Sequence, residues 1–151
     1  MPIGLALAQA ARQVSRAFDD ALASAGGSLP VWLVLLNIKT RQLANQRELA
    51  EAVGIREATL THHLNAMEAD GLITRQRHEQ NRRIHVVALT AAGEEAFLRI
   101  RDAAMTFDQR LRTGFTDSEL DAFEAMLSRL SGNADGPGDG LPWAGLAEDR
   151  S

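Results

Sequence analysis

The segment from Asn45 to Arg83 constrains the fold of this 151-residue chain more than any other. Asn45 is a favourable N-cap for a short helix over residues 46–52, and Gly54 is placed to end that helix. A second helix is predicted over residues 57–70, followed by a short strand and an arginine-rich loop. A capped helix, a glycine turn, a longer helix and a basic loop, in that order, predict a helix-turn-helix with a wing.

The helix predicted over residues 57–70 has one apolar face and a polar remainder. At helical spacing the apolar face comprises Leu60, His63, Leu64 and Met67. The other faces carry Thr59, Thr61, His62 and Asn65. Small polar side chains let a helix approach base edges, while an apolar back face anchors it, so this pattern predicts double-stranded DNA as a partner. The alternative is an ordinary solvated helix face.

The distribution of charge favours the same partner although the net charge is −4. Residues 39–90 carry eight basic and six acidic side chains, whereas residues 91–151 carry six basic and twelve acidic ones. Between Thr74 and Arg83 there are four arginines and only one acid, Glu79. A local basic patch on an acidic body can still follow the phosphates of DNA.

The flanking segments are predicted to be mainly helical. Helical spacing or capping residues indicate helices over residues 5–25, 29–40, 91–112 and 117–131. Thr116 and Glu119 form a capping-box pattern before the last of these. Short strands are predicted over residues 72–77 and 84–89. The predicted fold class is therefore mainly α with a small β-wing.

Several other classes of protein are disfavoured. The chain has no cysteine, no apolar run long enough to span a bilayer and no basic segment of a signal peptide at its start, so we expect a cytoplasmic location. It lacks a glycine-rich phosphate loop and a G-x-S-x-G elbow, so we expect neither enzyme activity nor a cofactor. Residues 132–151 are rich in glycine and are predicted to be a disordered tail.

The two adjacent histidines are assigned different roles. His62 is predicted to face DNA, whereas His63 falls on the apolar face and is expected to be a core or half-buried residue. The four histidines of the chain show no metal-ligand spacing, so no metal site is predicted.

The pattern resembles the multiple-antibiotic-resistance regulator (MarR) family of bacterial winged-helix transcription factors. The resemblance covers about residues 5–131. Four stretches carry most of it, and in chain order they read LPVWLVLL, QRELAEAVGI, ATLTHHLNAMEADGLI and NRRIHVVALTAAG. A fifth, FTDSELDAFEAMLSRL, is similar to the family's final dimerisation helix.

The resemblance implies a homodimer that places two winged helices on successive major grooves of a palindromic operator, about 34–36 Å apart. Residues 1–30 and 91–131 would form the dimerisation region, and residues 31–90 the DNA-binding region. The apolar stripes of the outer helices fit this arrangement; packing within one subunit is the alternative. The expected interface residues are Leu7, Phe18, Leu111, Phe115, Leu120, Phe123, Leu127 and Leu130.

The expected DNA-binding residues lie in the helix-turn-helix and in the wing. They are Gln46, Arg47, Arg56, Thr59, Thr61, His62, Asn65, Arg75, Asn81, Arg82 and Arg83. The family wing commonly reads Asp-x-Arg, and Asn81 here stands at the position of the acid. Asn81 brings no opposite charge, so Arg83 is expected to be held less rigidly.

The resemblance further implies a repressor that is released from DNA by a small, often aromatic, effector. Carried onto this chain, the neighbours of the effector pocket would be Trp32, Leu36, His63 and Met67, each of which is alternatively plain core. Two other functions remain open: a metal-sensing regulator of the same fold and a protein-binding winged-helix module.

Overall fold

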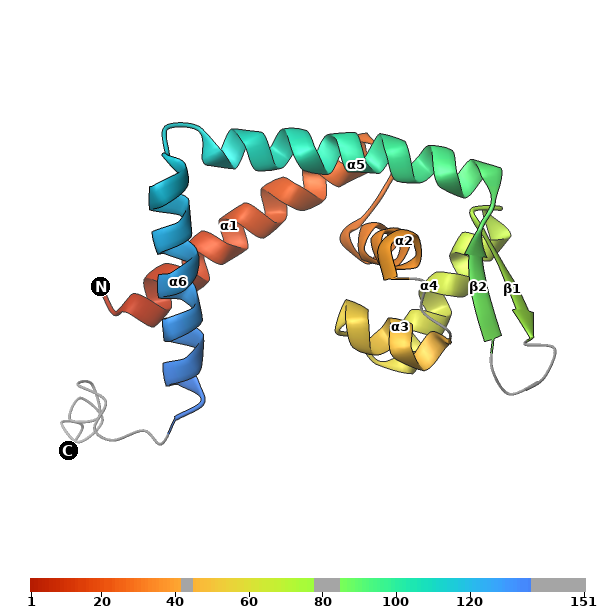
Figure 1. Cartoon of the computed structure of the whole chain (residues 1–151), viewed down its shortest axis with the longest axis horizontal. Coiled ribbons are helices and arrows are strands. Elements are labelled where there is room, and N and C mark those ends of the chain that lie inside the picture. Colours follow the sequence, from red (N-terminus) through yellow and green to blue (C-terminus); the bar gives the residue numbers. More distant parts are fainter. Residues whose placement is uncertain (42–44, 78–84, 137–151) are drawn as a thin grey trace, which may run out of the picture. The chain divides into compact units, whose positions relative to one another are not determined.

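The computed structural model describes residues 1–41, 45–77 and 85–136, and Figure 1 shows its elements. In chain order these are α1 (Ile3–Ser24), α2 (Leu29–Arg41), α3 (Gln46–Val53), α4 (Glu57–Ala69), β1 (Ile73–Arg77), β2 (His85–Leu89), α5 (Ala91–Arg112) and α6 (Asp117–Ala134). The fold is mainly α with a small two-stranded sheet, as predicted from the sequence, and every predicted helix and strand is present. The chain divides into two compact units, Met1–Leu111 and Arg112–Ser151.

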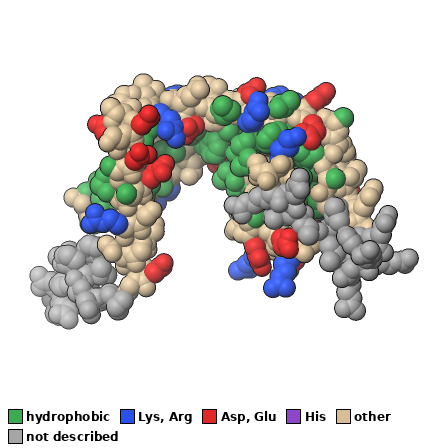
Figure 2. Space-filling model, in the orientation of Figure 1, with side chains coloured by type: hydrophobic (Ala, Val, Ile, Leu, Met, Phe, Trp, Pro, Cys, Tyr) green, Lys and Arg blue, Asp and Glu red, His purple; other side chains and the backbone are tan. Residues whose placement is uncertain are grey.

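The core of the first unit is built around α2. Val34 and Leu35 of this helix are completely buried. Buried leucines and isoleucines from α1, α3, α4, β1 and α5 complete the same cluster. Figure 2 shows hydrophobic side chains gathered in this unit between α5 and α2. The helix-turn-helix is therefore mounted on one continuous hydrophobic core.

Ring stacking, an ion pair and a cation–ring contact join α2 to α5. The rings of Trp32 and Phe97 are stacked, with centroids 5.8 Å apart. Lys39 Nζ lies 2.6 Å from Glu94 Oε2 and 5.9 Å from the centre of the Phe97 ring. Aromatic stacking and a cation over the ring stabilise the contact beyond what the burial of apolar surface contributes. The start of α5 is thus fixed to the helix at the centre of the core.

The two strands form an antiparallel hairpin beside α4 (Figure 1). Ile73 pairs with Leu89, and Arg77 pairs with His85 at the other end. The first strand begins at Ile73, one residue later than predicted, and His85 is the first described residue of the second. Residues 78–84, which connect the two strands, lie outside the described residues.

The start of α5 lies against the turn between α4 and β1. The Thr90 hydroxyl donates to the Gly71 carbonyl at 2.6 Å and accepts from the Gly93 N–H at 3.0 Å, so Thr90 caps α5. A Cβ atom on Gly93 would overlap with the carbonyl oxygen of Leu72. Only glycine allows α5 to approach the turn this closely.

The second unit contains α6. The Thr116 hydroxyl accepts from the Glu119 N–H at 3.2 Å, and the Glu119 carboxylate accepts from the Thr116 N–H at 2.9 Å. The predicted capping box is therefore present. The helix runs through Ala134, three residues beyond its predicted end, because a single glycine at position 132 weakens a helix by about 1 kcal/mol without ending it. Residues 137–151 of the predicted tail lie outside the described residues.

In the described part of the chain, we find no individual helix with the length and apolar character needed to cross a bilayer. The segments Ile3–Ser24 and Leu29–Thr40, which meet at 73°, reach that length and composition only as a bent pair.

Candidate nucleic-acid interface

Helix α4 is anchored by an apolar stripe and exposes polar residues on its other side. Leu60, Leu64 and Met67 are at most 2% exposed. Thr59, His62 and Asn65 are exposed, whereas Thr61 and His63 are half-buried. The burial of Leu60, Leu64 and Met67 agrees with the predicted apolar face, and His62 is more exposed than His63. The roles assigned to the two histidines stay predictions.

The turn before α4 has the local structure predicted for it. The Asn45 side chain accepts from the Glu48 N–H at 2.9 Å and caps α3. Gly54 follows α3 with φ +80, a left-handed conformation that costs glycine nothing. Arg56 precedes α4 in an extended conformation and makes no side-chain cap, which leaves its side chain exposed at the start of the helix.

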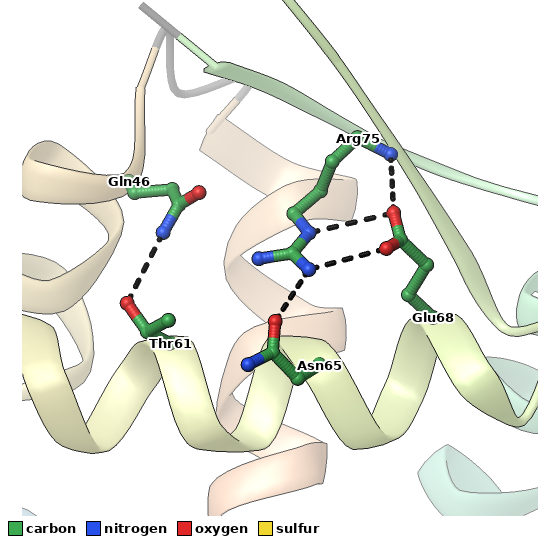
Figure 3. A network of polar contacts seen from close by, with 5 residues as sticks. All are labelled: Gln46, Thr61, Asn65, Glu68 and Arg75. Atoms are coloured by element: carbon green, nitrogen blue, oxygen red, sulfur yellow. Dashed lines mark hydrogen bonds and ion pairs between the residues drawn. The ribbon is translucent and has the colours of Figure 1, made fainter.

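One hydrogen bond connects the start of α3 to the polar side of α4. Gln46 Nε2 donates to the Thr61 hydroxyl at 3.5 Å, and that hydroxyl donates to the Glu57 carbonyl at 2.9 Å (Figure 3). The Thr61 hydroxyl thus uses its one proton within the helix and accepts a bond as well. Its methyl group remains as the part that can meet a ligand.

Arg75 on β1 holds two residues of α4 (Figure 3). Its Nη2 atom lies 3.1 Å from Glu68 Oε1 and donates to Asn65 Oδ1 at 2.5 Å. Its Nε atom donates to Glu68 Oε2 at 3.4 Å, and its backbone N–H donates to the same oxygen at 3.2 Å. The Arg75 side chain is only 17% exposed as a result. The structure therefore places Arg75, predicted from sequence as a DNA contact, as a brace between the wing strand and α4.

The brace favours the ionised form of Glu68. Hydrogen bonding from the Arg75 side chain lowers the pKa of Glu68 below its ordinary value of 4.5. Burial opposes this shift, while the charge and the backbone N–H of Arg75 reinforce it. Glu68 is thus a carboxylate at neutral pH, which keeps the pair charge-assisted.

Glu68 is a residue that the sequence interpretation missed. It is not on the apolar stripe and resembles any exposed acid of a helix. The available clue was its position seven residues before Arg75, across a glycine turn that brings the chain back along α4.

The other predicted DNA-binding residues are more loosely held or lie outside the described part. Arg47 is exposed and meets Glu51 only through a 3.5 Å contact within α3. Asn81, Arg82 and Arg83 lie outside the described residues, and with them the wing position at which this chain departs from the Asp-x-Arg pattern.

The predicted effector pocket is occupied by core contacts. Trp32 and Leu36 pack against the core cluster, and Met67 is part of it. A cavity of about 310 Å³ elsewhere in the first unit is lined by α1 and α5 residues that include Ala21, Asp102 and Phe107. None of the four predicted pocket residues lines it. The effector pocket stays a prediction.

Histidines do not assemble a metal site among the residues that are described. The rings of His62 and His63 are 5.8 Å apart and inclined by 62°. No group of three or more His, Cys, Asp or Glu side chains is placed to hold an ion within that part of the chain.

The predicted dimer residues differ in how far they are covered within one subunit. Leu7, Leu111, Phe115 and Phe123 are exposed, whereas Leu120, Leu127 and Leu130 are half-buried. Phe18 stacks on Phe107 of the same subunit, with ring centroids 5.0 Å apart. No residue of α6 is buried.

The fold and the sequence of this chain match those of known proteins. The model of the MarR family matches residues 28–85, which run from the start of α2 into β2. A solved structure of the transcriptional regulator PA3341 is 30% identical, with a TM-score of 0.72, and the match covers 88% of this chain and 98% of that one. The chain belongs to the MarR family. It is accordingly a winged-helix transcription regulator and not an enzyme.

Two further relatives are close to this MarR-family chain. The HTH-type transcriptional regulator BilQ of Clostridium symbiosum is 28% identical over 105 residues, which are 70% of this chain and 73% of BilQ. The transcriptional repressor CouR, solved with a 23-mer DNA duplex, is 29% identical with a TM-score of 0.77. That match covers 85% of this chain and 91% of CouR.

Proposed function

We propose that this chain binds double-stranded DNA as a homodimer and represses transcription from a palindromic operator until a small effector releases it. The observation that carries the proposal is the exposed polar side of α4, mounted on a buried apolar stripe and braced from β1 by Arg75. A helix that is fixed in this way can enter a major groove while keeping its position relative to the rest of the protein.

The residues around α4 have the chemistry that DNA requires. Thr59, His62 and Asn65 are exposed polar side chains at successive turns. Arg47 and Arg56 are exposed at the starts of the two helices, within reach of phosphates on either side. We assign Arg82 and Arg83 of the wing to the minor groove, where narrow A·T-rich stretches attract arginine.

The dimer is supported by apolar surface that one subunit leaves uncovered. Ile3, Leu5, Leu7 and Val14 of α1 are exposed, and so is Phe123 of α6. Hydrophobic side chains are visible along α6 in Figure 2. Exposed apolar side chains in such number favour burial against a partner. We therefore assign residues 1–30 and 91–131 to dimerisation and residues 31–90 to DNA.

The relative CouR supports the choice of repressor over activator, since it is a transcriptional repressor and was solved with DNA. We place the effector next to Trp32, Leu36, His63 and Met67, at the boundary between the DNA-binding lobe and α5. A protein that acts on chromosomal DNA would be cytoplasmic, and we propose that location here.

The test is a salt-controlled binding curve. A duplex library with a randomised core, followed by fluorescence anisotropy on the selected duplexes, would measure affinity and base preference together. We expect log Kd to rise linearly with log salt. Arg83→Ala should weaken binding to all sequences and reduce the salt slope by about one for each contact removed. His62→Ala should instead relax the preference for particular bases.

A binding curve without salt dependence would overturn the proposal in favour of a protein-binding winged helix. Ala58→Ser is a suitable control, because it alters an exposed position of α4 that has no assigned role.

A further inference from the structure

Asn65 is held in one orientation by a neighbour that can only donate hydrogen bonds. Arginine has five N–H donors and no acceptor. The atom of the Asn65 amide that meets Arg75 Nη2 at 2.5 Å is therefore the oxygen, Oδ1. The chemistry of the pair therefore fixes which end of the amide is which.

The nitrogen of the same amide points away from the brace. In Figure 3, Oδ1 is directed at Arg75 and Nδ2 is turned away from it. Within the described residues, Nδ2 has no hydrogen-bond acceptor, and Asn65 is exposed. The amide thus offers two N–H donors outward and keeps its acceptor for Arg75.

Arg75 cannot easily release the amide oxygen, because Glu68 holds the guanidinium. Two side-chain contacts, at 3.1 and 3.4 Å, fix Nη2 and Nε against the Glu68 carboxylate. A third bond ties the backbone N–H of Arg75 to the same carboxylate at 3.2 Å. Glu68 and Arg75 therefore act together on Asn65.

We propose that Glu68 and Arg75 are positioning residues that make Asn65 a donor-only reader of the major groove, selecting guanine over adenine at one base pair. The proposal rests on the DNA-binding function proposed above and adds a base class to it.

The base class follows from the patterns that base edges present. Guanine offers N7 and O6 as acceptors, and thymine offers O4. Adenine pairs with a free asparagine through both N7 and the N6 amino group, which requires Oδ1 and Nδ2 to face the same base. Arg75 draws Oδ1 toward β1, so that paired contact is disfavoured and adenine keeps only N7 as an acceptor, against two acceptors on guanine. Cytosine presents only the N4 amino donor, which a donor-only amide cannot bind.

The experiment compares base preferences of the full chain and its variants by selection from a duplex library with a randomised core. Asn65→Ala identifies the base pair that Asn65 reads, as the one whose preference disappears. We expect guanine there in the unaltered chain. Glu68→Gln and Arg75→Met should shift that single preference toward adenine, because the amide is then free to turn.

The matched control is Glu51→Gln. It removes the same charge from an ion pair of α3 whose partners are both largely exposed, and it leaves the brace intact. We expect its base preferences to equal those of the unaltered chain. Thermal unfolding of each variant establishes that a changed preference does not come from a partly unfolded protein.

A second measurement needs no variant and so does not depend on any variant folding. Replacing the guanine read by Asn65 with 7-deazaguanine removes the N7 acceptor, and affinity should fall about tenfold.

The outcomes separate this inference from the proposed function. A preference for adenine that is lost when its N6 amino group is removed would overturn the donor-only assignment. An Asn65-dependent preference that survives unchanged in Glu68→Gln and Arg75→Met would overturn the positioning role, with DNA binding still intact. No salt-dependent DNA binding by the unaltered chain would overturn the proposed function and this inference with it.

Discussion

Arg75 and Glu68 meet across the turn between α4 and β1, with Nη2 of the arginine 3.1 Å from Oε1 of the glutamate. Seven residues separate them in sequence, and the turn closes that distance. The pair fixes the wing strand to the helix proposed to read DNA. Because the guanidinium also holds Asn65, the same contact controls both local stability and the chemistry presented to a base.

The stability that this pair contributes should depend on pH. The pKa of Glu68 is lowered in the folded chain, so the contribution is present above the ordinary value of 4.5 and is lost as pH falls through the folded pKa. Glu68→Gln should therefore be less stable than the unaltered chain at neutral pH, and the difference should close in acid. Urea unfolding at several pH values measures it. A difference that does not change with pH would contradict the assignment of the shift to Arg75.

Thr61 should recognise a methyl group through its own methyl group. Its hydroxyl is used by Gln46 and by the Glu57 carbonyl. Thr61→Val keeps the methyl group and should keep any preference for thymine at the contacted base. Thr61→Ser removes it and should lower that preference about fourfold, the equivalent of one buried methyl group. Replacing the thymine with uracil should abolish the difference between the two variants. The idea fails if valine, rather than serine, loses the preference.

Gly93→Ala should destabilise the first unit by about 1–3 kcal/mol or more, because the added Cβ overlaps with the carbonyl oxygen of Leu72. The matched control is Gly4→Ala, where a Cβ would meet nothing within 4 Å. Chemical denaturation followed by far-ultraviolet circular dichroism compares the two. Equal stability of both variants would show that the turn at Leu72 can move away from α5.

Phe123→Arg should weaken the proposed dimer at least tenfold, about 1.4 kcal/mol, because it places a charge in the apolar stripe of α6. Ala125→Arg is the control: Ala125 is exposed and lies on the opposite side of the same helix from Phe123, Leu127 and Leu130. Sedimentation velocity over a range of concentrations gives both dissociation constants. Equal weakening by the two substitutions would argue against this stripe as the interface.

The elements of the fold were predictable because local chemistry determines them. The Asn45 cap, the glycine turn at Gly54 and the Thr116 capping box each lie within a few residues of the atoms they bond. The periodicity of α4 likewise placed Leu60, Leu64 and Met67 on the buried face. Only boundaries shifted, as at Ala134, where the cost of Gly132 is too small to end the helix.

The brace at Arg75 was not predictable in the same way. A basic residue beside a helix-turn-helix is expected to contact phosphate. Its charge alone does not indicate whether it instead forms an ion pair within the protein. The outcome depends on the angle at which β1 returns along α4, which brings Arg75 to Glu68 and Asn65. That angle is a property of tertiary packing, as is the close approach at Gly93.

The start of α5 is tied to the DNA-binding lobe at Glu94, at Thr90 and at Gly93, which leaves it no freedom to swivel there. A tilt of α5 should therefore move the proposed DNA-binding region, residues 31–90, together with the helix as one rigid body. The 22 residues of α5 span roughly 33 Å, so a tilt of about 10° at the far end would displace the lobe by roughly 6 Å. Against the half-site spacing of about 34 Å expected for the proposed homodimer, that displacement would take its two copies of α4 out of register with successive grooves.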